Sequence, residues 1–171
     1  MYRLLVIAFL LFTTLLMSSL SDNAYSSVRL EIRYGVFGVI INGDAIDFGQ
    51  SKYQSKSDLI SFEDGDGFTI HIYDPNASLG DLMRSIGMDF KDGCFVVDNI
   101  RNYCDLGDVR LKVFVNGNEL DSPQDIMDYI PLDCDIILLT YGVEKVDEVG
   151  NQLEYLDRHK PASCNDNIFN S

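Results

Sequence analysis

Apolar and polar residues alternate along several short segments of this chain, and the clearest alternation covers residues 28–34. A period of two places every second side chain on the same face, so this segment is expected to form a half-buried β-strand. Gly35 interrupts the alternation and an apolar run resumes at Val36, so we expect a bulge or bend near Gly35 and Gly38. The side chains expected on the buried face are those of Val28, Leu30, Ile32 and Tyr34.

Other segments also have the composition of strands, and two Asn-Gly pairs are typical of the turns between strands. Asn42-Gly43 and Asn116-Gly117 favour two-residue hairpin turns, in which both residues take positive φ. The polar residues 50–57 are expected to form a loop. The run IILLTY, residues 136–141, is apolar on both faces and therefore predicts a central, buried strand. Further strands are expected over residues 45–48, 59–62, 68–73 and 109–115.

Helical patterns occur at three places. Ser78 and Asp81 form the pattern of a capping box, and an apolar stripe follows until Gly87, so we expect a helix over residues 78–87. Residues 123–129 predict a short helical turn. Residues 144–158 predict an amphipathic helix whose apolar side would contain Val146, Val149, Leu153 and Leu156.

The order of these elements predicts an α+β fold. Strand, hairpin, helix, strand, short helix and buried final strand is the order of a β-grasp, the ubiquitin-like roll, which we expect over residues 28–142. An all-β sandwich is the alternative, and the helix at residues 78–87 argues against it. Residues 143–171 are expected to form the short C-terminal amphipathic helix and a polar tail.

Residues 1–21 have the features of an export signal. A single cation, Arg3, precedes the apolar run of residues 4–17, and small polar residues follow it. The segment is either a cleaved signal peptide, with Ser19 and Ser21 at a small-x-small site, or an N-terminal membrane anchor. An anchor needs about 17–25 residues, and we favour it. In both cases the domain is exported: it faces the outside at the cell membrane, or it is secreted.

The charge of the chain limits the classes of partner. The net charge is −14, and the sequence pI is near 4.2. Such a surface repels nucleic acid phosphates and anionic lipid head groups, so we expect no nucleic acid partner. We interpret the acidity as a source of solubility outside the cell.

Four cysteines fit an oxidising compartment. Cys94 and Cys104 enclose a short segment with a turn sequence at Asp98-Asn99, so a hairpin would bring the two sulfurs together. Cys134 and Cys164 are then expected to pair by elimination. The chain has no C-x-x-C motif, which argues against a thioredoxin-like redox site.

Several stretches of the chain form a recognisable set: IINGDAIDFGQSKYQ, FEDGDGFTIHIY, SLGDLMRSIGMDF, YC, LKVFVNGNEL and DCDIILLTYG. They resemble a family of small secreted or membrane-anchored archaeal proteins, notably from ammonia-oxidising lineages. Its members carry stretches of the form DFS-x-x-KYQ, DGDG-x-x-IH-x-H and DRILISYG, and the resemblance covers about residues 30–142. The family has no established activity, so the resemblance implies a location and an architecture only.

The same resemblance implies a possible metal site. Family members often carry His-x-His in the first strand and in the IH-x-H strand, a set that would suit copper. Here the second strand reads His71-Ile72-Tyr73, the first has no histidine, and His159 is the only other imidazole. A strand histidine without a metal is therefore the favoured interpretation. The candidate metal ligands are His71, Tyr73, Asp64 and Asp66.

Two loop motifs have both a functional and a structural interpretation. The carboxylates of residues 63–67 suggest calcium, but the EF-hand spacing is missing and Asp-Gly pairs also form turns, which we favour. Asn76-Ala77-Ser78 is an N-glycosylation sequon, and its Ser78 is also the expected helix cap.

The chain lacks the P-loop, G-x-G-x-x-G, H-E-x-x-H and G-x-S-x-G motifs, so we do not expect an enzyme or an organic cofactor. We expect an extracytoplasmic, membrane-tethered binding or assembly module, an accessory component of a cell-envelope complex. Its partner would be an envelope or membrane protein. The alternative is a metal-handling protein for copper or calcium.

Overall fold

The computed structural model describes residues 32–143 and 145–164, over which the chain has a mixed α+β fold made mostly of sheet. The main sheet contains β1 (Arg33–Ile41), β2 (Asp44–Ala45), β3 (Ile60–Phe62), β4 (Thr69–Ile72), β8 (Arg110–Val115), β9 (Asn118–Glu119) and β10 (Ile136–Gly142). Their order is β3, β4, β1, β10, β8, β9, and β2 pairs with the end of β1. β1 and β10 are parallel at the centre, and β4 and β8 flank them in the antiparallel direction.

β10 has the central, buried position that its apolar sequence predicts. Ile137 and Leu139 belong to the larger core on one face of the sheet, while Leu138 belongs to a smaller core on the opposite face. A strand with neighbours on both sides and cores on both faces needs apolar side chains throughout. Both Asn-Gly pairs also form their expected turns, with positive φ at each of the four residues.

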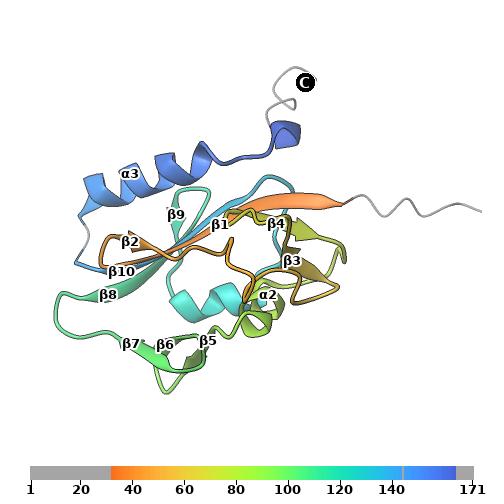
Figure 1. Ribbon diagram of the computed structural model, residues 1–171. Helices are drawn as coiled ribbons and strands as arrows, with labels where there is room; N and C mark the ends of the chain where they lie inside the picture. Colours follow the sequence, from red (N-terminus) through yellow and green to blue (C-terminus); the bar gives the residue numbers. More distant parts are fainter. Residues whose placement is uncertain (1–31, 144, 165–171) are drawn as a thin grey trace, which may run out of the picture.

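The larger core lies between the main sheet, α2 (Leu79–Ser85) and the 3₁₀ helix η1 (Pro123–Asp128). Figure 1 shows α2 on one side of the sheet and α3 (Val146–Asp157) on the other. Aromatic rings fill much of the larger core, and the rings of Phe48 and Phe62 stack with their centroids 4.7 Å apart. Complete burial of one such side chain stabilises the fold by about 1.5–3 kcal/mol.

The loop of residues 50–57 contributes more to this core than its polar sequence predicts. Tyr53 is buried against Phe48. The side-chain amide of Gln54 donates to the carbonyl oxygens of Phe48 and Asp66, and its oxygen accepts from the backbone of Gly65. One glutamine therefore ties three separate segments of the chain together at the edge of the core.

α3 covers the opposite face of the sheet with Val149 and Leu156, as its amphipathic pattern predicts. The expectation for Val146 was wrong, because this side chain is 87% exposed. Val146 is the first residue of α3, and Val149 is the first of its side chains to reach the smaller core.

β1 is a single unbroken strand, so the bulge expected near Gly35 and Gly38 was wrong. A Cβ atom on Gly38 would lie 2.6 Å from Leu156 Cδ2, and one on Gly35 would lie 3.3 Å from Ile70 Cδ1. The two glycines therefore allow close packing against the strand. The strand is also buried on both faces, and Ile32, which we expected to be buried, is exposed. Residues 28–31 lie outside the described residues.

A second, smaller sheet consists of β5 (Asp89–Lys91), β6 (Cys94–Val97) and β7 (Arg101–Cys104). The sequence predicts the hairpin of β6 and β7, whose turn at Asp98 and Asn99 takes positive φ. It does not predict β5, because three residues are too few for a periodic pattern. The small sheet lies on the same side of the main sheet as α2 and forms the lower end of the molecule in Figure 1.

The expected export segment, residues 1–21, and the end of the polar tail, residues 165–171, lie outside the described residues. None of the helices in the described part of the chain has the length and apolar character that crossing a membrane requires.

Two glycines on different helices provide a matched test of packing. A Cβ atom on Gly80 in α2 would lie 2.4 Å from the backbone oxygen of Met127, whereas one on Gly150 in α3 would meet nothing within 4 Å. Alanine favours a helix by about 1 kcal/mol over glycine. We expect Gly150→Ala to raise the free energy of unfolding by up to about 1 kcal/mol, and Gly80→Ala to lower it by about 1–3 kcal/mol. Urea unfolding measures both values, and a gain in both variants would contradict the packing of α2 on η1.

Candidate functional site

The residues that the sequence singles out as metal ligands lie around the strands β3 and β4. His71 lies on β4, and its Nδ1 is 4.0 Å from Glu63 Oε2. The ring of Tyr34 on β1 meets the His71 ring edge-on, with the centroids 5.1 Å apart. Ser61 donates a hydrogen bond of 3.0 Å to the other oxygen of Glu63. His71 is therefore held between a carboxylate and an aromatic ring.

Tyr73 is the second candidate ligand that the structure places in this cluster. Burial and a hydrogen bond to Glu63 raise the pKa of Tyr73 to about 12. The same hydrogen bond from Tyr73, with a contribution from Ser61, holds the pKa of Glu63 below its usual value. The two side chains stabilise each other in the charge states that they have at neutral pH.

Ionisation of Tyr73 should make the stability of the protein depend on pH in the alkaline range. Because its pKa rises on folding from 10.0 to about 12, its contribution to stability is complete below pH 10 and is lost as the pH rises towards about 12. In Tyr73→Phe this part of the alkaline loss should disappear. Urea unfolding across that pH range, with absorbance to follow tyrosinate, provides the measurement. The tyrosine that disappears from the titration of the variant should be one that ionises at about pH 12. Loss of a tyrosine that ionises near the usual pH of 10 would contradict the assignment.

The other two candidate ligands do not complete a metal site. Asp66 Oδ1 accepts from the backbone N–H groups of Phe68, at 2.7 Å, and Thr69, at 3.1 Å. Burial tends to raise the pKa of Asp66, but these hydrogen bonds outweigh burial and lower it. Asp64 is exposed in a tight turn with Gly65, and both residues have positive φ. Within residues 32–143 and 145–164, no three His, Cys, Asp or Glu side chains are arranged to share an ion. Metal binding by this set stays a prediction.

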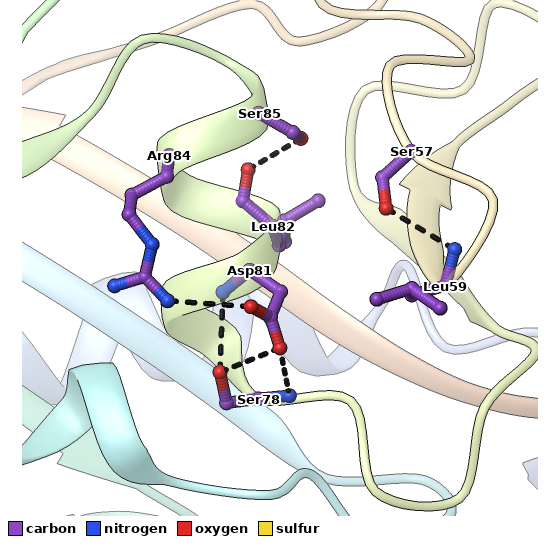
Figure 2. Close-up of polar contacts among 7 residues, drawn as sticks. All are labelled: Ser57, Leu59, Ser78, Asp81, Leu82, Arg84 and Ser85. Atoms are coloured by element: carbon purple, nitrogen blue, oxygen red, sulfur yellow. Dashed lines mark hydrogen bonds and ion pairs between the residues drawn. The ribbon is translucent and has the colours of Figure 1, made fainter.

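The glycosylation sequon precedes α2 directly. Asn76 is exposed, and its backbone N–H donates to Asp74. Ser78 is the N-cap of α2, as predicted, and Figure 2 shows its reciprocal hydrogen bonds with Asp81. The Ser78 hydroxyl accepts from the Asp81 backbone at 3.2 Å, and the Asp81 carboxylate accepts from the Ser78 backbone at 2.9 Å. Ser78 is therefore both the cap and the third residue of the sequon.

Two substitutions separate these roles. Asn76→Gln removes the sequon and leaves the cap, so the free energy of unfolding of unglycosylated protein should not change. Ser78→Ala removes both and should lower that free energy by about 1 kcal/mol. Urea unfolding of protein made without glycosylation tests the cap, and intact mass of protein from the native host tests the sequon. Equal stability of the two variants would contradict the capping role.

A second polar cluster, not predicted from the sequence, surrounds Asp98 in the β6–β7 turn. Asp98 accepts from Tyr53 Oη at 2.7 Å, from Lys52 Nζ at 3.0 Å and from an Arg101 nitrogen at 2.7 Å. Burial tends to raise the pKa of Asp98, but these three donors lower it below its usual range. The cluster joins the small sheet to the loop of residues 50–57. Only the turn at Asp98 was visible in the sequence.

Both expected disulfides are present. Cys94 pairs with Cys104 across β6 and β7, in positions directly opposite each other in the sheet. Cys134 pairs with Cys164 in the 3₁₀ helix η2 (Ala162–Cys164), so the segment after α3 is tied to the start of β10. The two bonds indicate an oxidising, extracytoplasmic environment.

Three aromatic side chains form a row across the small sheet, one from each strand. Phe90 on β5 lies opposite Phe95 on β6, and Phe95 lies opposite Tyr103 on β7. The rings of Phe90 and Phe95 have centroids 5.5 Å apart. The ring of Tyr103 meets that of Tyr141 edge-on at 5.2 Å, and the Tyr141 hydroxyl donates to the carbonyl oxygen of Cys104. The row is therefore supported by the main sheet.

This row forms one wall of a cleft of about 270 Å³ between the small sheet and the start of η1. We call it the aromatic cleft. Apolar side chains of the main sheet and η1 and a carboxylate complete it. The residues that line it are Phe90, Gly93, Phe95, Tyr103, Asp105, Leu111, Ser122, Pro123 and Gln124. The sequence did not reveal this cleft, because each aromatic residue comes from a different short strand.

A wider hollow of about 480 Å³ lies between the Asn42-Gly43 turn and the start of α3. The residues that line it include Glu148, Asn151, Gln152 and Val143. It contains no row of rings and no charged cluster that would select a ligand. The aromatic cleft is therefore the better candidate site.

Comparisons of the chain with known protein families, with curated proteins and with solved structures found no match.

Proposed function

We propose that this protein is an extracytoplasmic binding module, tethered to the membrane through residues 1–21, that docks on an envelope protein through its small sheet. The observation that carries the proposal is the aromatic cleft together with exposed apolar side chains at both ends of the small sheet. Leu106, next to the cleft, is 79% exposed, and Ile100, in the β6–β7 turn, is 81% exposed. Aromatic side chains beside exposed aliphatic ones are typical of protein-binding surfaces.

The construction of the small sheet supports this role. The Cys94–Cys104 disulfide closes one end of the β6–β7 hairpin, and the hydrogen bonds of Asp98 hold its turn. A surface that is ordered before it binds loses less conformational entropy on association. The small sheet therefore presents its rings and aliphatic side chains in a fixed arrangement.

The strand arrangement supports the β-grasp as the architecture on which this surface is built. β1 and β10 are parallel neighbours, β4 and β8 flank them, and α2 follows β4 along the chain. We infer that the small sheet is an insertion between the helix and the third main strand of such a roll. The location that we propose is also that of the archaeal family that the sequence resembles.

Photocrosslinking in the native host tests the docking. A photoreactive phenylalanine analogue replaces Leu106 in one variant and Val146 in the other, because both are exposed aliphatic residues on different faces. We expect one crosslinked species of defined mass from position 106, recovered with the membranes, and none of that mass from position 146. The proposal fails if position 106 yields no such species and the detergent-solubilised protein is a monodisperse monomer, or if both positions give the same species.

A further inference from the structure

The aromatic cleft has the chemistry of a site for a cation. Its wall contains the half-buried rings of Phe90 and Tyr103, with the Phe95 ring, which is only 1% exposed, between them in the strand pairing. The faces of aromatic rings attract positive charge. Asp105 lies at the cleft, where its Oδ1 accepts from the backbone N–H of Leu111 at 2.9 Å. None of the residues that line the cleft is Lys or Arg. Rings and a fixed carboxylate on one small cavity favour a cation over a neutral apolar group.

Charged residues of both signs adjoin the cleft along the chain. Asp92, Asp121 and Asp125 directly adjoin lining residues along the chain. Three cations also adjoin lining residues: Lys91 follows Phe90, and Arg110 and Lys112 flank Leu111. Successive side chains of a strand point to opposite faces, so Lys91 lies on the face away from the Phe90 ring, and Arg110 and Lys112 lie on the face of β8 away from Leu111. The Lys91 ammonium is 3.9 Å from Asp89, the other neighbour of Phe90. The charged group that lines the cleft itself is Asp105, and the chain as a whole has a net charge of −14, which complements a positively charged segment of a partner.

The size of the cleft limits the ligand. Sites for whole small molecules measure about 300–1,000 Å³, and this cleft measures about 270 Å³. One long side chain therefore suits it better than a complete metabolite. Arginine fits the lining better than lysine, because its planar guanidinium stacks on rings and binds a carboxylate with two parallel hydrogen bonds.

We propose that the aromatic cleft binds an arginine side chain of the partner protein, stacked on the half-buried rings of Phe90 and Tyr103 and paired with Asp105. This proposal rests on the proposed function and names the chemistry of the partner at that site. An arginine buried in a pocket is a frequent hot spot of protein interfaces. We therefore expect the partner to present a basic segment to an acidic surface.

The test uses the disulfide-bonded protein and two probes, N-acetyl-arginine methylamide and N-acetyl-citrulline methylamide. The two probes have nearly the same shape, and only the first is charged. Aromatic and backbone NMR resonances of Phe90, Phe95 and Tyr103 should shift saturably with the arginine probe, with a dissociation constant in the millimolar range. The citrulline probe should bind at least about fivefold more weakly, because it lacks the charge.

Variants locate the binding. Asp105→Asn keeps an oxygen for the Leu111 N–H and removes the charge, and Phe90→Leu keeps an apolar side chain and removes a ring. Each should weaken the arginine probe by about threefold to fivefold. Phe68→Leu is the matched control, because Phe68 is a half-buried ring stacked on His159 outside the cleft; it should leave the affinity unchanged. Amide spectra establish that each variant is folded.

Equal binding of the two probes, or no shift at the aromatic row, would overturn the proposal. The same holds if the Phe68 variant weakens binding as much as the Phe90 variant. These results are independent of the crosslinking experiment. A defined crosslink from position 106 without arginine binding would leave the docking function intact and remove only the arginine. Arginine binding without a crosslink would support the cleft and count against the docking.

Discussion

Replacement of Asp135 by alanine is expected to lower the free energy of unfolding by roughly 3–5 kcal/mol. The Asp135 side chain is buried, with only 4% of the residue exposed, and accepts three hydrogen bonds. The donors are the Asn116 amide at 2.7 Å, the Tyr129 hydroxyl at 2.6 Å and the Leu132 backbone at 2.7 Å. Burial and the bond to Asp135 raise the pKa of Tyr129 far above its usual value. Alanine would leave all three donors without a partner.

Exchanging the residues at positions 135 and 116 tests whether the arrangement of donors and acceptors around Asp135 stabilises the fold. Asp135→Asn alone places its amide N–H₂ group opposite that of Asn116, so one donor faces another, and we expect a loss of about 1–3 kcal/mol. Adding Asn116→Asp restores a donor and an acceptor. The Asn116 side-chain oxygen accepts from the Ile136 backbone at 2.9 Å, and an aspartate there can do the same. Aspartate also tolerates the positive φ of this position.

Urea unfolding of the single and double variants measures the coupling between the two positions. The double variant should be within about 1 kcal/mol of the natural protein. If the losses in the free energy of unfolding of the two single variants simply add in the double variant, the result would contradict the arrangement of donors and acceptors around Asp135.

Removal of the Cys134–Cys164 disulfide is the other large expected effect. The two cysteines are 30 residues apart, so the chain-entropy account gives a loss of about 4 kcal/mol. The bond holds the segment that follows α3, and α3 covers the smaller core by placing Leu156 over Gly38. Serine at both positions removes the bond without leaving a free thiol.

The Cys94–Cys104 pair is the matched control. Its cysteines are 10 residues apart, so replacing both with serine should cost about 3 kcal/mol. Urea unfolding of the two double-serine variants gives the comparison. A larger loss from the Cys94–Cys104 pair would contradict the entropic account of how α3 is retained.

The elements that the sequence predicted correctly are those decided by neighbouring residues. The Ser78–Asp81 capping box, the two Asn-Gly turns and the apolar run of β10 each form as expected. The Cys94–Cys104 bond belongs with them, because a short hairpin alone brings its sulfurs together.

The features that the sequence did not reveal depend on residues distant in the chain. Gly38 was interpreted as the site of a bend, whereas its role depends on Leu156 of α3. Asp98 meets Lys52 and Tyr53 only after the small sheet has folded against the loop of residues 50–57.

The aromatic cleft has the same origin. Phe90, Phe95 and Tyr103 are ordinary core residues when each is considered alone. They become a row only through the register of three strands, one of which is too short to be recognised. The proposed site therefore depends on long-range pairing, which a local pattern does not contain.

The location of the domain is the premise of this account, and one labelling measurement on intact host cells tests it. Cells are treated with a lysine reagent that does not cross membranes and then lysed in a thiol-blocking reagent, and the intact mass of the protein is recorded. We predict lysine labelling on the cells and no blocked cysteine unless a reductant is added first. Protein that stays unlabelled in intact cells and carries four blocked thiols would contradict the account.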